Sequence, residues 1–237
     1  MRGAPLTRRF VIVACVAIVG LAAFIVSTGE KNKSSDQLSK YRPPSNPADY
    51  IIENRLAEYP EISAAIVSAL RAKEGKQVRG SVIRAGITAH HVPIAVSFIA
   101  DFYHELRGSP GSRATFVVVG PDHFERCFTS AATTKQPHAT AFGNLEPEIE
   151  IIDALHAVGV GIDDGCFDNE HSVGSQTLFI KHLFPGARIV PLIFSATTDA
   201  KLVGGIASVL SAYKERITVI VSTDFSHYQN YKRATEL

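Results

Sequence analysis

ATFVVVGPDH, residues 114–123, is a continuous apolar run that ends in a proline, an aspartate and a histidine. The run does not alternate between apolar and polar residues, which is typical of a strand that is covered on both faces. RIVPLIF (188–194) and ITVIVST (217–223) have the same character, and SVIRAGIT (81–88) has a strand-like apolar pattern. These four stretches predict the strands of a sheet that is buried on both sides.

Amphipathic stretches alternate with these strands and predict the helices. They are residues 61–75, 92–106, 146–159, 171–186 and 199–215. In the second of these, Ile94, Phe98 and Phe102 recur every four residues and predict one apolar face. Strands that alternate with helices predict a three-layer α/β/α fold with a largely parallel central sheet. Residues 127–134 and 139–146 are expected to form a small hairpin or paired strands.

The N-terminal part of the chain predicts a membrane-spanning helix or a signal. Residues 1–9 are basic, and residues 10–26 form an uncharged apolar run that would span about 25 Å as a helix. We expect an uncleaved anchor, with a cleaved signal peptide as the alternative. Residues 27–47 are polar and predict a linker, and residues 48–237 the folded domain. The domain is therefore expected outside the cytoplasm, either membrane-anchored or exported.

Charge and cysteine usage restrict the function classes. The chain has 24 basic and 23 acidic residues, a formal net charge of +1, so no basic excess suits a nucleic acid backbone. No glycine-rich phosphate loop follows the predicted strands. Cys127 and Cys166 are expected to be two separate thiols, although export would allow them to pair.

Histidines and one aspartate follow the predicted strands directly. His90 follows the strand at 81–88, His123 follows the apolar run at 114–120, and Asp224 and His227 follow the last strand. Because the carboxyl ends of parallel strands lie on one edge of a sheet, these side chains are expected to converge. His91 is expected to be a neighbour, since adjacent residues point in different directions.

Imidazole and carboxylate groups at one edge point to a metal site, since both bind Fe(II), Zn and Cu. His90 and His123 are the expected metal ligands. The loop DNEHS (168–172) adds Glu170 and His171 to this edge. Asp224 either binds the metal or fixes the tautomer of a histidine, and it also suits a turn. The residues expected to be ligands or acid/base groups beside the metal, and assigned here to catalysis, are His171, Asp224 and His227.

Five segments resemble those of Memo-like proteins, also called AmmeMemoRadiSam system protein B. They are VVVGPDHF (117–124), TAFGNLEPE (140–148), NEHSVGSQTLFIKHLFP (169–185), RIVPLIF (188–194) and VIVSTDFSHY (219–228). The third is similar to the family's EHSIE segment, with Gly174 in place of the usual glutamate, and AHHV (89–92) stands where the family has PHAG. The order and approximate spacing of the segments agree from about residue 83 to the end.

The resemblance implies an α/β fold similar to class III extradiol ring-cleaving dioxygenases, which use non-haem Fe(II). It places the family's metal histidines on His90 and His123, and its other motif residues on His171, Asp224 and His227. Family members take a third ligand, a Cys or a carboxylate, from further along the chain. The sequence ends in YKRATEL, which is typical of the opening turn of a helix. The domain is therefore expected to be truncated at its C-terminus, and the third ligand is unassigned.

Three functions follow as expectations. The first is a metal-dependent oxidoreductase of dioxygenase-like type that acts on an unidentified small molecule, with iron as the expected metal and copper or zinc as alternatives. The second is a non-catalytic copper- or iron-binding protein, or a partner of a radical-SAM protein. A zinc hydrolase is a third and weaker interpretation, since His and Asp sets serve that chemistry too.

Overall fold

The computed structural model of the chain describes residues 51–78, 80–109 and 115–224. Its helices are α2 (Pro60–Arg71), α3 (Val96–Gly108), α4 (Ile149–His156), α5 (His171–Leu183) and α6 (Ala200–Ala212), with the short 3-10 helices η2 (Arg55–Glu58) and η3 (Asp164–Cys166). Its strands are β1 (Ala85–Thr88), β2 (Thr115–Pro121), β3 (Ala131–Thr133), β4 (Glu146–Pro147), β5 (Gly161–Ile162), β6 (Arg188–Phe194) and β7 (Ile217–Ser222).

The strands form one mostly parallel sheet, as the sequence predicts. Its order is β1-β7-β2-β6-β3-β5, and β4 pairs with β6 beside this path. Among the strand pairs of the described residues, only β3 and β6 run antiparallel, and an isolated antiparallel bridge joins His138 to Leu145. The expected hairpin of residues 127–134 and 139–146 is wrong, because β3 and β4 each pair with β6 instead.

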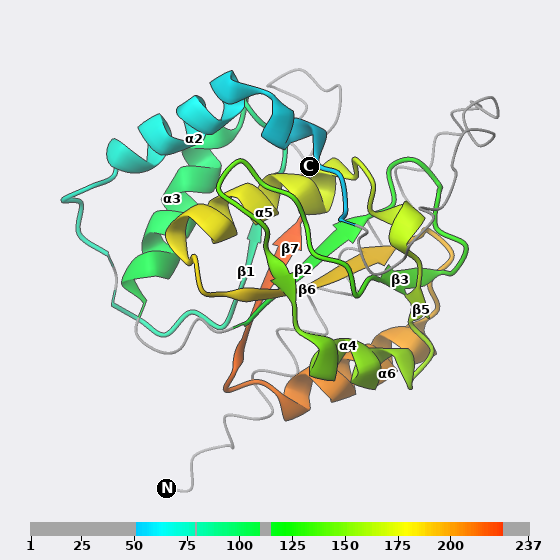
Figure 1. Cartoon of the computed structure of the whole chain (residues 1–237). Helices are drawn as coiled ribbons and strands as arrows, with labels where there is room; N and C mark the ends of the chain where they lie inside the picture. The colour runs from blue at the N-terminus through cyan, green and yellow to red at the C-terminus, as the bar shows by residue number, and fades with distance from the viewer. Residues whose placement is uncertain (1–50, 79, 110–114, 225–237) are drawn as a thin grey trace, which may run out of the picture.

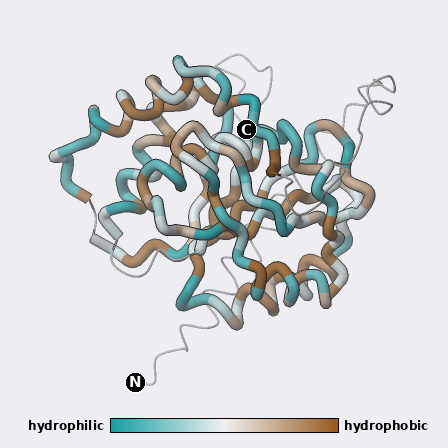
Figure 2. The backbone as a smooth tube through the Cα atoms, viewed as in Figure 1, coloured by the Kyte–Doolittle hydropathy of each residue, from teal (hydrophilic) through white to brown (hydrophobic). Residues whose placement is uncertain are grey.

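The helices cover both faces of the sheet, which confirms the mixed α/β fold with a mostly parallel sheet. Figure 1 shows α2, α3 and α5 on one side and α4 and α6 on the other. Side chains along β2 alternate between the two cores: Phe116 and Val118 pack toward the first group of helices, and Val117 and Val119 toward the second. Figure 2 shows hydrophobic and hydrophilic stretches alternating along the helices, as expected of elements with one buried face.

The apolar face expected for α3 is only partly buried. Ile99, Tyr103 and Leu106 are fully buried, whereas Ile94 and Phe98 are 79% and 77% exposed. β1, which α3 follows, lies at the edge of the sheet, so this end of the layer has less sheet to cover. The four-residue spacing therefore identified a helix but not the whole of its buried face.

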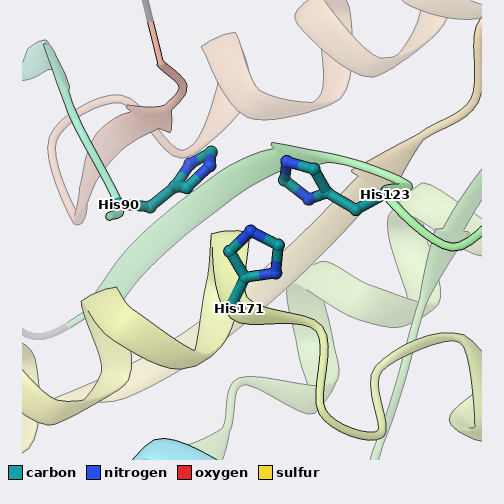
Figure 3. Close-up of side chains that lie close together, drawn as sticks. All are labelled: His90, His123 and His171. Carbon is teal, nitrogen blue, oxygen red and sulfur yellow. The ribbon is translucent and has the colours of Figure 1, made fainter. Parts of the chain in front are cut away.

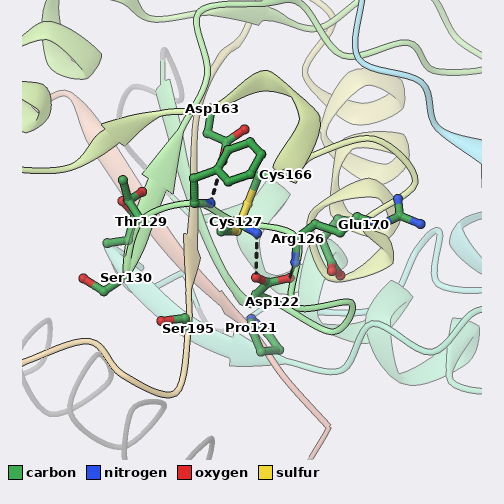
Figure 4. Close-up of a disulfide and its surroundings, with 12 residues drawn as sticks. Pro121, Asp122, Arg126, Cys127, Thr129, Ser130, Asp163, Cys166, Glu170 and Ser195 are labelled. Atoms are coloured by element: carbon green, nitrogen blue, oxygen red, sulfur yellow. Dashed lines mark hydrogen bonds between the residues drawn. A yellow bond between two sulfur atoms is a disulfide. The ribbon is translucent and has the colours of Figure 1, made fainter. Parts of the chain in front are cut away.

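A disulfide joins Cys127 to Cys166, so the expectation of two separate thiols is wrong (Figure 4). The two residues are 39 positions apart in sequence, yet their Cα atoms are 4.7 Å apart. The fold brings the loop after β2 against the segment before α5, and this separation lies within the range that a disulfide needs.

No helix of the described residues is long and apolar enough to cross a membrane. The predicted anchor or signal at residues 10–26 lies outside the described residues, as do residues 1–9, the linker at 27–47 and His227.

Candidate metal centre

Three histidines from three separate elements meet at the carboxyl edge of the sheet (Figure 3). His90 follows β1, His123 follows β2, and His171 is the first residue of α5. The ring centroid of His123 lies 4.9 Å from that of His90 and 4.1 Å from that of His171, and the rings of His90 and His171 are 5.1 Å apart. Each ring offers a nitrogen within 4.8 Å of the other two, which is close enough for one metal ion.

The strand order explains why His90 and His123 meet. β7 lies between β1 and β2 and is parallel to both: Thr88 is in register with Ser222, and Val119 with Val221. The two histidines therefore leave the same edge of the sheet on either side of the end of β7. Adjacent strands lie about 4.8 Å apart, so residues from strands two apart reach one ion only by leaning inward.

The start of α5 brings the third histidine to this edge. Glu170 caps the helix, and its side chain accepts a hydrogen bond from the backbone N–H of Ser172. The Ser172 hydroxyl donates to the carbonyl of Pro121 at the end of β2, over a distance of 3.1 Å. Gly120 permits this approach, because a Cβ at that position would lie 2.7 Å from the Cβ of Ser172.

Glu170 fixes the orientation of His123. Its carboxylate is 2% exposed and accepts the backbone N–H of His123 at 3.0 Å, while Nδ1 of the same ring lies 2.8 Å from Oε1. Burial alone would raise the pKa of Glu170, but the hydrogen bond and charge of His123, with further help from His171 and Ser172, hold it below its ordinary value. An ionised carboxylate only accepts, so Nδ1 carries the proton and Nε2 of His123 is left for an ion.

His90 has its own orienting partner. Its Nδ1 lies 3.4 Å from Oγ of Ser222, whose hydroxyl hydrogen is already donated to the carbonyl of Ser172. The Ser222 oxygen is therefore the acceptor, and Nδ1 of His90 carries the proton. Nε2 is left with a lone pair, is buried, and has no hydrogen-bond partner among the described residues.

The surroundings of that nitrogen fit a cation. Burial, with the nearby His123 and His171, lowers the pKa of His90 to about 4 despite the opposing effect of Asp224, so the ring is neutral near pH 7. Its bare Nε2 faces Oδ2 of Asp224 at 3.5 Å. A lone pair opposite a carboxylate in a buried site is unfavourable unless a positive charge lies between or beside them.

His171 is the most exposed of the three histidines, and Asp224 is partly buried beside His90. The His171 side chain is 37% exposed, and burial together with the nearby His123 lowers its pKa, which favours the neutral form that binds metals. Asp224 is 12% exposed and lies 4.0 Å from Nδ1 of His91, whose side chain is 61% exposed. The sequence-predicted residues that this edge brings together are thus His90, His123, His171 and Asp224.

A buried polar network behind His90 was not predicted from the sequence. Gln176 donates from Nε2 to the carbonyl of Ala89 at 2.9 Å and to Oγ of Ser222 at 3.0 Å. Its Oε1 accepts the hydroxyl of Tyr103 at 3.0 Å. The network joins the ends of β1 and β7 to α3 and α5. A glutamine in the middle of a predicted helix gave no sequence signal for it.

A second group of metal-binding residue types, Asp122, Cys127 and Cys166, lies close together. Its two sulfur atoms are bonded to each other, which removes both thiolates as ligands. The Asp122 carboxylate accepts the backbone N–H groups of Arg126 and Cys127 at 3.1 and 3.0 Å. This group therefore shapes the turn after β2.

Asn54 lies against Gly174, the position where the resemblance to Memo-like proteins predicts a glutamate. Its Nδ2 donates to the carbonyl of Gly174 at 2.9 Å and to the hydroxyl of Thr177 at 3.2 Å. A Cβ on Gly174 would lie 3.0 Å from Oδ1 of Asn54. Asn54 thus occupies the space into which a longer side chain at position 174 would extend.

Comparisons of the chain with a family model and with individual proteins point to the same family. The family model described as "Memo-like protein" matches residues 59–236. A MEMO1 family protein of Caldivirga maquilingensis is 31% identical over 176 residues, which are 71% of this chain and 60% of that protein. The MEMO1 family protein PAE0818 of Pyrobaculum aerophilum is 28% identical over 161 residues, 66% of this chain and 57% of that protein. The chain thus spans less than two thirds of the length of these relatives.

Proposed function

The chain belongs to the Memo-like protein family, and from this premise we propose that His90, His123 and His171 hold one divalent metal ion, with iron as the first candidate. The observation that carries the proposal is the buried Nε2 of His90, which lacks a hydrogen-bond partner among the described residues and belongs to a group of three histidines whose ligand atoms lie within 4.8 Å of one another. Neutral imidazoles suit iron, copper and zinc alike.

We further propose that the site supports an oxidoreductase of dioxygenase-like type. Three protein ligands leave coordination positions open, and a metal there would supply Lewis-acid or redox chemistry to a small molecule bound beside it. The fold resemblance to class III extradiol dioxygenases is the reason for placing iron before copper and zinc.

The chain's own residues would bind, orient and move protons around that molecule. Glu170 keeps His123 in one tautomer, and Ser222 does the same for His90. Asp224, 3.5 Å from Nε2 of His90, can accept a proton at Oδ2 beside the cluster. His227 remains the proposed second proton carrier, although it lies outside the described residues.

A second candidate function is non-catalytic handling of copper or iron, and His91 favours it. Its side chain is 61% exposed, next to the 12% exposed Asp224, which in turn lies beside the 1% exposed His90. The metal-binding groups of these three residues become steadily less exposed from the surface to His90, and such a series suits the uptake of an ion. The radical-SAM partner named above stays a prediction.

Anaerobic titration with Fe(II) tests the metal site. The wild-type protein is expected to bind one equivalent, and the His90→Ala/His123→Ala variant none. His104→Ala is the matched control, because its ring lies on α3 and contacts the carbonyl of Lys76 instead of the cluster. Undiminished iron binding in the double variant would remove the proposal. O₂ consumption with a catechol-like substrate then separates the enzyme from the metal-handling protein.

The location outside the cytoplasm is also a proposal. The Cys127–Cys166 disulfide supports it, because such bonds persist in oxidising compartments. Cell fractionation with an antibody to the domain tests it. Recovery of the domain in the cytoplasmic fraction would count against an anchor or an export signal.

A further inference from the structure

Two irregular segments carry two of the three histidines. The turn at residues 122–128 presents His123, and residues 163–171 lead through η3 to His171 at the start of α5. β2 pairs with β6 and β7, so the sheet positions the beginning of the first segment but not the second. The distance between His123 and His171 therefore depends on the contact of α5 with the end of β2 and on links between the two segments.

The disulfide is the covalent link between them. Cys127 lies four positions after His123, and Cys166 lies five positions before His171. Figure 4 shows the bond between the two loops, with Asp122 on one side and Asp163 on the other. Two hydrogen bonds accompany it: Arg126 donates from Nη1 to the carbonyl of Asp168 at 3.1 Å, and the N–H of Phe128 donates to Asp163 at 2.9 Å.

Each loop contains a residue in the left-handed region between its cysteine and its histidine. Glu125 has φ 51° and Asn169 has φ 59°. Such values are uncommon for residues other than glycine and persist where the surroundings hold them. Two hydrogen bonds to the segment before α2 stabilise this conformation of Asn169: its N–H donates to the carbonyl of Glu53, and its Oδ1 accepts the N–H of Arg55.

The turn that contains Glu125 is stabilised by hydrogen bonds within the turn itself. Asp122 accepts two backbone N–H groups within the turn, from Arg126 and Cys127. These bonds shape the turn but do not attach it to the segment that carries His171. The disulfide adds a covalent attachment where this turn closes, beside the hydrogen bonds that Glu170 accepts from the backbone N–H and Nδ1 of His123.

We propose that the Cys127–Cys166 disulfide is a positioning element of the metal centre, which holds the His123 turn against the segment that carries His171. The inference rests on the proposed metal site and names a device that controls its affinity. Without this bond, part of the free energy of metal binding is used to bring the three imidazoles together, so the affinity for the metal falls. Partners that orient metal ligands typically change affinity by about 10–100-fold, and we expect about a tenfold loss here.

Titration of Co²⁺, followed by its visible absorption, tests this inference in four proteins. They are the wild type, the Cys127→Ser/Cys166→Ser variant, the wild type reduced with a phosphine and desalted, and Leu210→Ala. Reduction breaks the S–S bond and gives two thiols, while the phosphine becomes its oxide and water supplies the oxygen and both protons. Leu210 is a fully buried residue of α6, in the core on the other face of the sheet, so truncating its side chain lowers stability without touching the centre.

Each outcome has one meaning. The inference predicts a Kd about tenfold weaker and altered absorption bands for the serine variant, and a wild-type Kd for Leu210→Ala. The reduced protein should likewise bind more weakly at the histidines and recover after reoxidation, and any Co²⁺ held by its freed thiols and Asp122 is recognised by thiolate-to-metal absorption. Equal affinity in all four proteins would overturn it while leaving the metal site intact. Equal weakening in Leu210→Ala would overturn it as well, because stability alone would then explain the loss. No binding by the wild type would contradict the proposed function itself.

Discussion

Replacing Gly120 with alanine tests how closely β2 and α5 must approach for the metal centre to form. A Cβ on Gly120 would lie 2.7 Å from the Cβ of Ser172. Carbon atoms in contact are ordinarily about 3.5–4.0 Å apart, so the first turn of α5 has to move by about 1 Å. Crowding of this size costs about 1–3 kcal/mol of the free energy of unfolding.

The displacement would act directly on the candidate ligands. Ser172 follows His171, and its N–H donates to Glu170, which orients His123. Moving this turn by about 1 Å exceeds the tolerance of about 0.2 Å that metal–ligand distances allow. We therefore expect the Kd for Fe(II) to weaken by about tenfold or more.

Urea denaturation and anaerobic Fe(II) titration measure the two effects, and Gly204→Ala is the matched control. A Cβ on Gly204 would meet nothing within 4 Å, and the residue lies inside α6. The control should keep its affinity for iron and gain about 0.5–1 kcal/mol, since alanine favours a helix over glycine. A Gly120→Ala protein with wild-type stability and wild-type affinity would refute the reasoning that the close approach of β2 and α5 builds the site.

Three further changes have defined outcomes. Glu170→Gln removes the charged acceptor of His123 and should weaken Fe(II) binding by about 10–100-fold in the same titration; an unchanged Kd would contradict the orienting role. Burial lowers the pKa of His138 from 6.5 to about 3. As the pH falls, the unfolded chain therefore takes up a proton at this histidine before the folded protein does. The contribution of neutral His138 to the free energy of unfolding is complete above pH 6.5. It falls by about 1.4 kcal/mol per pH unit as the pH drops toward 3. Urea melts of His138→Gln across this range should lack that part of the pH dependence. The Cys127→Ser/Cys166→Ser variant should lose about 4 kcal/mol of the free energy of unfolding, from a loop that spans 39 positions; a loss under 1 kcal/mol in urea melts would contradict it.

The sequence predicted the sheet because its central strands are buried on both faces. The runs at β2, β6 and β7 are continuously apolar, and only a sheet covered by helices on both sides hides every side chain of such a strand. The same logic brought His90 and His123 to one edge, since each follows a parallel strand. Their burial and tautomers were not readable, because they depend on Ser222 and Glu170 from distant parts of the chain.

The disulfide and the polar network show where local patterns carry no information. Cys127 and Cys166 lie in irregular segments, so no periodicity fixed the positions of their Cα atoms relative to each other. Gln176 sits in a helix that is buried on nearly all sides, and its partners come from three other elements. Such contacts depend on how the elements pack, which the pattern of a single segment does not describe.

A structure of the protein after anaerobic loading with Fe(II) tests the central claim most directly. The account predicts one ion about 2.1 Å from Nε2 of His90, from Nε2 of His123 and from a ring nitrogen of His171. An ion bound elsewhere, or three imidazoles that stay free at saturating Fe(II), would contradict it.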